Sequence, residues 1–218
     1  MSEEKATEPI QALLVKKGLE EATKGAENFL GAVLGEPLKA IGGLITDQIN
    51  SRRQSNLIVI VKNAATKLKD AGVNPKSVPL KIIHPLLEYC SLEEDPSMQE
   101  RWANLLANAA DPSVTITMSP AYADILRQLT SEEAQLLDLI LKELQRKALA
   151  AKPTEVIRFV THEELKTLHD TIVTNDVSFK VAQSNLFRNE LIVQADKGDI
   201  ELTELGFQFI SACNRSKV

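Results

Sequence analysis

The sequence predicts a mainly α-helical fold, with a helical N-terminal and central region followed by a C-terminal winged-helix-like α+β domain. Three observations support this prediction. Apolar residues recur at helical spacing in most segments. Aromatic residues make up only 4% of the chain, which favours an aliphatic, alanine-rich helical core. A turn flanked by two strand-like segments occurs only near the C-terminus. We place the domain boundary after residue 127, which gives domains 1–127 and 128–218.

The first distinctive segment, residues 25–45, is apolar and rich in glycine. Within it, Gly31 and Gly35 have the GxxxG spacing that lets two helices approach closely in lipid. Because the charged residues Glu36 and Lys39 interrupt the segment, we favour two tightly packed soluble helices. The alternative is a helical segment that lies on a membrane or enters it.

A long helix is expected from residue 37 to residue 71, with Gly72 as its C-terminal stop. Its segment Leu57–Val61 would suit a strand by itself, but the alanine- and lysine-rich sequence that follows favours a helix. The short basic segment Ser51–Gln54 has two arginines without neighbouring aromatic or glycine residues. We therefore interpret it as a solvated helix face rather than a phosphate site.

Two helices in the centre of the chain are expected to form a hairpin. The first spans residues 79–91 and contains Pro85, which predicts a kink or a restart. The second has Asp95 as its N-cap and ends at Asp111, which precedes a proline. Its apolar face carries Trp102, the only tryptophan of the chain, and we expect this side chain to be buried against the first helix.

The tryptophan helix also carries a polar stripe. Arg101, Asn104 and Asn108 recur at intervals of three and four residues, and Asp111 lies beyond them. If these side chains are buried, they must be hydrogen-bonded, and they form a structural network with Trp102. If they are exposed in a groove, they form a recognition surface. We favour the network.

The C-terminal elements follow the order of a winged helix, which is three helices and then a two-stranded hairpin. Thr130 and Glu133 have the spacing of a capping box at the start of the first helix, and Thr161 is the expected cap of the second. The turn Asp196–Asp199 separates the two strands of the hairpin. In order, we expect a helix at 131–151, a strand at 156–160, a helix after residue 161, a helix at 178–190, strands at 191–194 and 200–203, and a last helix around residues 205–210.

A winged helix raises the question of DNA binding through its third helix. Lys180 and Arg188 are the candidate nucleic-acid contacts on that helix. However, the chain has a net charge of −5, and residues 131–218 carry more acidic than basic residues. Because bulk charge then opposes binding to phosphates, we favour a structural or protein-binding winged helix over a DNA-binding one.

The sequence contains no pattern that indicates an enzyme, a cofactor or a metal site. Cys90 and Cys213 make no disulfide framework and no zinc pattern, so we interpret both as small buried apolar residues. His162 and His169 lie about 10 Å apart on a helix, which is too far for two ligands of one zinc ion. No P-loop and no serine nucleophile elbow is present. Free cysteines, no signal peptide and no apolar run of about 20 residues together predict a cytoplasmic protein.

The tryptophan helix and its neighbours resemble a known family. One similar segment is Gln99-Glu-Arg-Trp-Ala-Asn-Leu-Leu-Ala-Asn-Ala-Ala-Asp-Pro112, and its core Trp102–Asn108 is the most specific part of the resemblance. Further similar segments are Val78–Ile83, Glu88–Asp95, Ser119–Ser131 and Leu202–Cys213. Over residues 35–213 the chain is similar to the Abi-alpha (abortive infection alpha) family. The resemblance implies a role in abortive infection, a bacterial defence in which an infected cell halts phage production at its own expense. It implies no catalytic residue.

Together these features predict a bacterial phage-defence protein that is not an enzyme and acts through a protein partner or through self-association. No small-molecule substrate and no cofactor is expected. One alternative is a membrane-associated effector that uses residues 25–45 and lies at the inner membrane. The other is a winged-helix DNA-binding regulator that uses Lys180 and Arg188.

Overall fold

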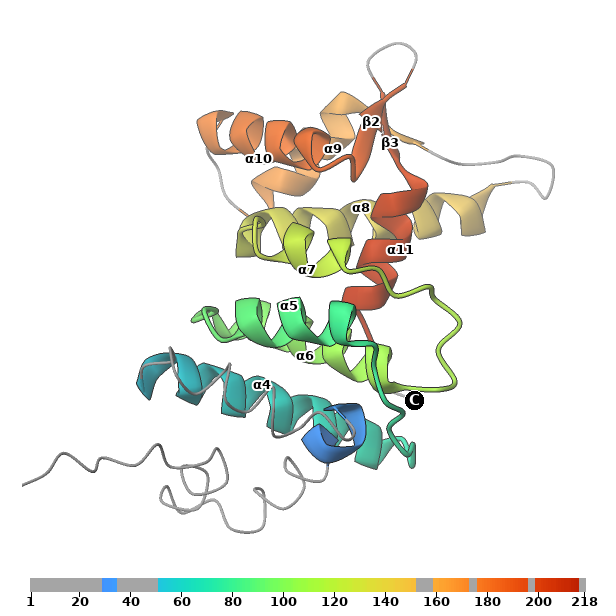
Figure 1. The fold of residues 1–218 in the computed structure, drawn as a ribbon. Helices are drawn as coiled ribbons and strands as arrows, with labels where there is room; N and C mark the ends of the chain where they lie inside the picture. The colour runs from blue at the N-terminus through green and yellow to red at the C-terminus, as the bar shows by residue number, and fades with distance from the viewer. Residues whose placement is uncertain (1–28, 35–50, 152–158, 173–175, 196–198, 216–218) are drawn as a thin grey trace, which may run out of the picture. The chain divides into compact units, whose positions relative to one another are not determined.

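The structure is a computed structural model that describes residues 29–34, 51–151, 159–172, 176–195 and 199–215 (Figure 1). The chain forms two compact units. The first contains Met1–Arg127 and Ala212–Val218, and the second contains Gln128–Ser211. The sequence analysis places residues 212–218 with the second domain. In the structure they belong with the first unit, because side chains of the tryptophan helix bind the backbone there.

The first unit consists of helices packed around the tryptophan helix. Its described elements are a helical segment at 29–34, α4 (Ser51–Asp70), α5 (Leu80–Cys90), α6 (Pro96–Ala110) and α7 (Ala121–Leu126). The tryptophan helix, α6, packs most extensively against α4 and also packs against α5. Trp102 is 1% exposed, so its expected burial is confirmed, although α4 rather than α5 is the larger partner of its helix.

Local signals set both ends of α6. The Asp95 carboxylate accepts hydrogen bonds from the backbone N–H groups of Ser97 (2.8 Å) and Met98 (3.1 Å), and Pro96 occupies the first turn. The hydrogen bond from the Ser97 hydroxyl and that from the Met98 backbone lower the pKa of Asp95. At the other end, Asp111 has extended backbone angles. The expected N-cap and stop of this helix are therefore confirmed.

Two expectations concern the continuity of α4 and α5. Leu57–Val61 lies inside α4, so the helical interpretation is confirmed; the expected start of this helix at residue 37 lies outside the described residues. α5 continues through Pro85 without a break, so of the two expected alternatives, a kink or a restart, the restart does not occur. Proline removes one helical hydrogen bond, and burial of the apolar side chains on both sides offsets that loss. These side chains are Ile82, Ile83, Leu86 and Leu87.

The basic segment Ser51–Gln54 contributes a helix cap. Arg53 donates to Ser91 Oγ from Nε (3.0 Å) and from Nη2 (2.8 Å), and Nη2 also donates to the carbonyl oxygen of Glu88 (3.2 Å). These acceptors lie at the C-terminal end of α5, where carbonyl groups lack partners within the helix. The interpretation of this segment as a solvated helix face is therefore wrong for Arg53.

The second unit combines helices with a small antiparallel sheet. Its elements are α8 (Ser131–Ala150), β1 (Phe159–Val160), α9 (His162–Asp170), α10 (Asp176–Arg188), β2 (Ile192–Gln194), β3 (Ile200–Leu202) and the first part of α11 (Glu204–Cys213). β3 pairs with both other strands, which gives the order β1-β3-β2. The expected mainly α-helical class with a small C-terminal sheet is confirmed. Residues 156–158 of the expected first strand lie outside the described residues.

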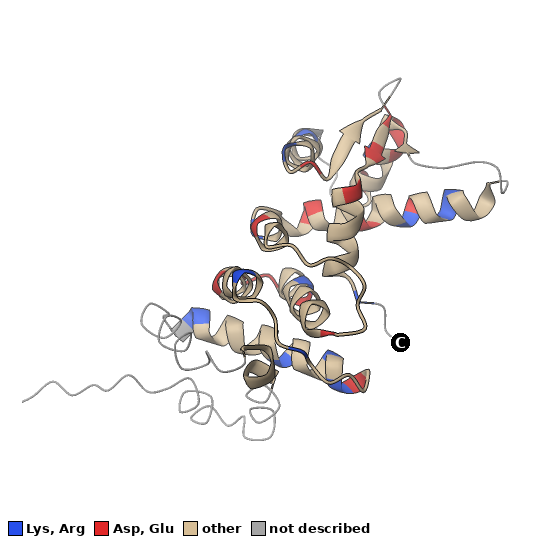
Figure 2. Cartoon of the chain, turned by 45° about the vertical axis from the view of Figure 1, so that its right-hand side comes forward, with Lys and Arg blue, Asp and Glu red and all other residues tan. Residues whose placement is uncertain are grey.

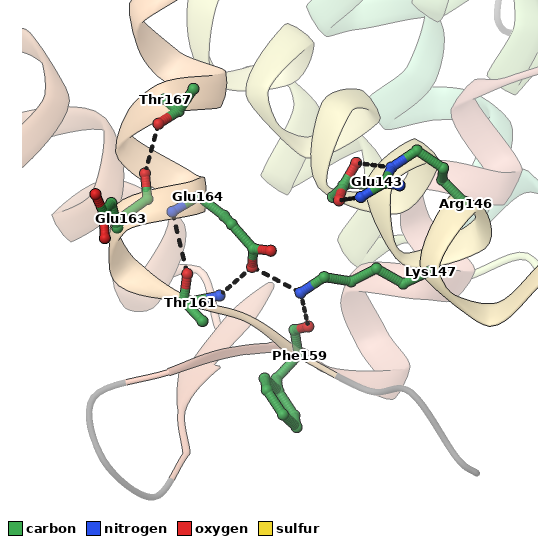
Figure 3. Close-up of polar contacts among 8 residues, drawn as sticks. All are labelled: Glu143, Arg146, Lys147, Phe159, Thr161, Glu163, Glu164 and Thr167. Atoms are coloured by element: carbon green, nitrogen blue, oxygen red, sulfur yellow. Dashed lines mark hydrogen bonds and ion pairs between the residues drawn. The ribbon is translucent and has the colours of Figure 1, made fainter. Parts of the chain in front are cut away.

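Capping boxes begin both α8 and α9. The sequence predicts the first box, and at Thr161 it predicts the cap alone. In the second box, the N–H of Thr161 donates to Glu164 Oε2 (2.8 Å) and the N–H of Glu164 donates to Thr161 Oγ1 (3.1 Å) (Figure 3). Lys147 donates to the same Glu164 oxygen (2.6 Å) and to the Phe159 carbonyl oxygen (3.3 Å), so one cation joins α8 to β1 and α9. Burial would raise the pKa of Glu164, but the bonds from Lys147 and Thr161 hold it below its usual value.

α10 ends at Arg188, earlier than the sequence predicts, because the chain turns in a Schellman motif. Glu190 has a φ of 57°, in the left-handed region. The N–H of Leu191 donates to the Leu186 carbonyl oxygen (3.1 Å), and that of Glu190 donates to the Phe187 carbonyl oxygen (2.9 Å). This motif usually has a glycine at the left-handed position. A glutamate stands there instead, so the sequence gives no signal for the stop.

Candidate functional site

The polar stripe of α6 binds the end of α11. Asn104 Nδ2 donates to the carbonyl oxygen of Cys213 (3.1 Å), and Asn108 Nδ2 donates to those of Ala212 (2.9 Å) and Asn214 (3.1 Å). The last carbonyl groups of a helix have no donors within that helix. The two asparagines therefore act as C-terminal caps that are supplied from a different helix.

Arg215 joins this arrangement through Asp111. Its Nη1 donates to Asn108 Oδ1 (2.9 Å), and its Nη2 donates to Asp111 Oδ2 (2.5 Å). The other carboxylate oxygen of Asp111 accepts from the backbone N–H (2.8 Å) and the hydroxyl (2.6 Å) of Ser113. Burial would raise the pKa of Asp111, but the bonds from Ser113 and Arg215 hold it below its usual value. The carboxylate is therefore charged and hydrogen-bonded at neutral pH.

The five residues of the sequence-derived stripe have different environments. Asn104, Asn108 and Asp111 are 6%, 4% and 2% exposed, whereas Arg101 is half-buried. Trp102 is fully buried, and its Nε1 has no hydrogen-bond partner among the described residues, so it contributes packing. We use the name α6 cluster for Asn104, Asn108, Asp111 and Arg215. Sequence reasoning missed Arg215, because it lies 107 residues from Asn108.

Lys180 and Arg188 line a groove of about 630 Å³ on α10. Figure 2 marks the basic residues of this helix in blue. Val177 and Val181 line the same groove, lie one helical turn apart, and are 69% and 60% exposed. We use the name α10 groove for the surface formed by Val177, Lys180, Val181, Ser184, Asn185 and Arg188 of α10, with Thr130 and Glu133 at the start of α8.

The acidic residue of the α10 groove is already hydrogen-bonded. Glu133 is 3% exposed, and its Oε2 accepts from the backbone N–H of Thr130 (2.8 Å) and from Asn185 Nδ2 (2.8 Å). Arg188 donates to Asn185 Oδ1, which is a neutral acceptor. The base of the groove is therefore polar and hydrogen-bonded. Its exposed side chains are two valines, two cations and the two hydroxyl residues Thr130 and Ser184. The sequence analysis singled out the cations and missed the valines, although residues 177, 181, 184 and 188 have helical spacing.

A buried histidine in the second unit contacts an acidic and a hydroxyl group. His169 is fully buried on α9, and its Nε2 lies 2.5 Å from Oε1 of Glu132, which also accepts a hydrogen bond from the Ser178 hydroxyl. Glu132 stands between the other two residues, so the Ser178 hydroxyl is bonded to the carboxylate rather than to the imidazole. His162 and His169 both contact the ring of Phe179. In the described ranges, no three His, Cys, Asp or Glu side chains are grouped so that they could hold a metal ion.

The two cysteines and the glycine-spaced segment complete the sequence-derived candidates. Cys90 and Cys213 are buried and unpaired with each other, as expected, and burial raises the pKa of the Cys90 thiol. A Cβ atom built on Gly31 would meet no atom of the described residues within 4 Å, so the part of the chain that the structure describes shows no close helix approach there. Gly35 lies outside the described residues. Among the helices that the structure describes, none is long and apolar enough to cross a membrane.

Comparisons with known proteins give one match. The family model for abortive infection alpha matches residues 52–194, which is more than half of the chain and extends from α4 to β2. This match confirms the resemblance, over a shorter range than residues 35–213. Neither a curated protein nor a solved structure shows significant similarity to the chain. The α6 helix, the α8 capping box and the α10 groove all lie inside the matched range, and the chain belongs to the abortive infection alpha family.

Proposed function

We propose that this protein acts in abortive infection as a non-enzymatic interaction module in the bacterial cytoplasm. The observation that supports the proposal is the α10 groove. Along its helix, the exposed Val181 lies between the cations Lys180 and Arg188, and the exposed Val177 precedes Lys180. Exposed apolar side chains that are grouped and flanked by polar ones are typical of protein-binding surfaces. Family membership supports the defence role, and the groove supports the interaction role.

We further propose that the second unit is a winged helix. Its element order supports this assignment: the helices α8, α9 and α10 precede the antiparallel pair of β2 and β3. In such a domain the third helix presents its outer face to a partner. This helix is α10, and the α10 groove lies on it.

The defence role is tested by infecting a phage-sensitive bacterial host with and without the gene, at low and at high phage dose. We expect fewer plaques at low dose, and death of the infected cells without phage release at high dose. Equal plaquing with and without the gene would reject the proposal.

The interaction role is tested in the same assay with Val181→Glu. We expect loss of protection, because a carboxylate replaces an apolar contact in the groove. The matched control is Val59→Glu, the same substitution at a 42% exposed valine of α4. Protection that survives Val181→Glu, or that is lost equally with both variants, would count against the α10 groove.

DNA binding is the second candidate function, and Lys180 and Arg188 on the exposed side of α10 favour it. Val177 and Val181 oppose it, because apolar side chains on the contact helix do not pair with phosphates. A gel shift on duplex DNA that survives moderate salt and falls with Lys180→Ala and Arg188→Ala would establish DNA binding. Absence of a shift would remove it.

A membrane-associated effector would use the glycine-spaced residues 25–45, of which only residues 29–34 are described. Fractionation of resting and infected cells tests this alternative. Recovery of the protein with the inner membrane after infection would support it, and recovery only in the soluble fraction in both states would reject it.

A further inference from the structure

We propose that the α10 groove binds an amphipathic helical segment of a partner protein, with acidic residues beside its apolar face. This inference rests on the proposed interaction role and names the chemistry of the partner. The evidence for this inference is the shape of the groove, its exposed valines and the charges around them.

The groove has the length of a short helix. Val177, Val181, Ser184 and Arg188 follow one another at intervals of four, three and four residues, so they form one stripe along α10. At 1.5 Å per residue this stripe is about 16 Å long. A partner helix of about three turns would cover it.

The two valines form the apolar part of the stripe. Val177 and Val181 are one helical turn apart and project their side chains to the same side. Both are more than half exposed, whereas Phe179, Ala182 and Leu186 on the opposite side of α10 are at most 3% exposed. The inner side thus supplies the core of the unit, and the exposed valines on the outer side offer an apolar surface to a partner.

The charges specify an acidic partner. Lys180 lies beside the valines and Arg188 lies two turns further along the helix, about 12 Å away. Among the side chains that the structure describes, which do not include Asp176, no carboxylate is bonded to Lys180 or Arg188. Arg188 donates to the neutral amide of Asn185, and Glu133 is bonded to Thr130 and Asn185. Acidic residues beside the apolar face of a partner would be attracted to these cations. The attraction would orient the partner on the groove and increase the rate of association.

The test is a binding assay on the full chain with a defined probe. The probe is a fluorescein-labelled peptide of about 16 residues, with leucines on one helical face and glutamates beside them. Its twin carries lysine in place of every glutamate. We expect a rise in fluorescence anisotropy with the acidic probe and none with the basic twin, and weaker binding of the acidic probe in high salt. Equal binding of both probes would overturn the proposal.

Variants locate the binding in the groove. Val181→Glu is expected to weaken binding of the acidic probe by about tenfold or more, and Val59→Glu on α4 is expected to leave it unchanged. The double variant Lys180→Glu with Arg188→Glu should lose the acidic probe and gain the basic twin, which a merely unfolded variant cannot do. Unchanged affinity of Val181→Glu for the acidic probe would overturn the proposal.

Other occupants give different results. Binding of a duplex DNA probe that is lost with Lys180→Glu would assign the groove to nucleic acid and overturn the inference. A dimer that is seen in sedimentation and dissociates with Val181→Glu would show that the groove binds a second copy of the chain. That result would also overturn the inference. If the acidic probe binds as expected but the gene gives no protection, the defence role fails and the groove assignment stands. If Val181→Glu abolishes protection but the acidic probe does not bind, the interaction role stands and the acidic helical partner is rejected.

Discussion

The α6 cluster and the α10 groove both contain polar residues that recur at helical spacing along one helix. The polar residues of α6 are buried in the fold, whereas the cations of α10 are exposed. On α6, Asn104 and Asn108 face the end of α11 and are almost completely buried. On α10, Lys180 and Arg188 face outward, with Val181 60% exposed beside them. Helical spacing identifies a stripe in either case. Only the neighbouring elements decide whether it stabilises the protein or is available to a partner.

The comparison also separates two kinds of polar residue. In the α6 cluster, Asp111 and Arg215 are bonded to each other and to neighbouring groups, which makes their replacement costly for stability. In the α10 groove, the buried Glu133 is hydrogen-bonded, whereas Lys180 is exposed. We therefore expect variants on α6 to change stability and variants on α10 to change binding.

The largest expected effect is on the packing of α6. Trp102→Ala should lower the free energy of unfolding by about 3–5 kcal/mol, because it empties the site of the largest fully buried side chain. Urea denaturation followed by circular dichroism measures the change. Trp102→Phe should cost less, because the Trp102 Nε1 has no hydrogen-bond partner to lose in the described structure. A cost below about 1 kcal/mol for Trp102→Ala would contradict the packing role of α6.

The next effect concerns the buried ion pair of the α6 cluster. Asp111→Ala should cost about 2–4 kcal/mol, because it leaves the mostly buried Arg215 guanidinium without its partner. Asp124→Ala is the matched control, since it removes the exposed pair of Asp124 and Arg127 and should cost at most about 1 kcal/mol. If both variants lowered the free energy of unfolding equally in denaturant, the ion pair of Asp111 and Arg215 would stabilise the fold no more than an exposed ion pair does.

The pH dependence of stability sharpens this assignment. The pKa of Asp111 is lower in the folded protein than its usual value. Its contribution is therefore fully present above a pH of about 4, where the unfolded carboxyl group is already ionised, and is lost as the pH falls through the folded pKa. Denaturation at pH 7 and at successively lower pH should show the destabilising effect of Asp111→Ala shrinking in acid. An effect that stays constant down to pH 2 would mean that the charge of Asp111 does not stabilise the fold.

The smallest effect on stability is expected in the α10 groove. Val181→Glu should change the free energy of unfolding by no more than about 0.5 kcal/mol, because the side chain is 60% exposed and contributes little to the core. The same denaturation experiment measures it, with Val59→Glu as the comparison. A loss of several kcal/mol would show that α10 needs Val181 for packing, and the contrast between the two stripes would disappear.

Expectations that depended on neighbouring residues were the most accurate. The caps at Asp95, Thr130 and Thr161 and the capping box of α8 lie where the sequence predicts them, since each bond joins residues at most three positions apart. The family resemblance also rested on local segments around α6. By contrast, the restart that was one of the two alternatives expected at Pro85 does not occur, because burial of the surrounding side chains outweighs the local preference of proline.

Contacts between distant residues were not predictable. Arg53 binds Ser91 across 38 residues, and His169 binds Glu132 across 37 residues, and neither pair has a spacing signal. Gly206 gives a similar example, because a Cβ atom there would collide with the backbone carbonyl oxygen of Leu191. Nothing in the neighbouring sequence indicates that this position of α11 requires glycine.

The sequence by itself determined the helical class of this protein, the ends of its best-capped helices and its family, because periodicity and capping act within a few residues. The tertiary structure alone decided which polar stripe is buried. Asn108 and Arg215 meet only after the chain returns to α6, 107 residues later. Val177 and Val181 remain exposed because the inner side of α10 packs into its unit and leaves their side uncovered. Burial depends on the packing of distant elements, and periodicity along one helix does not encode it.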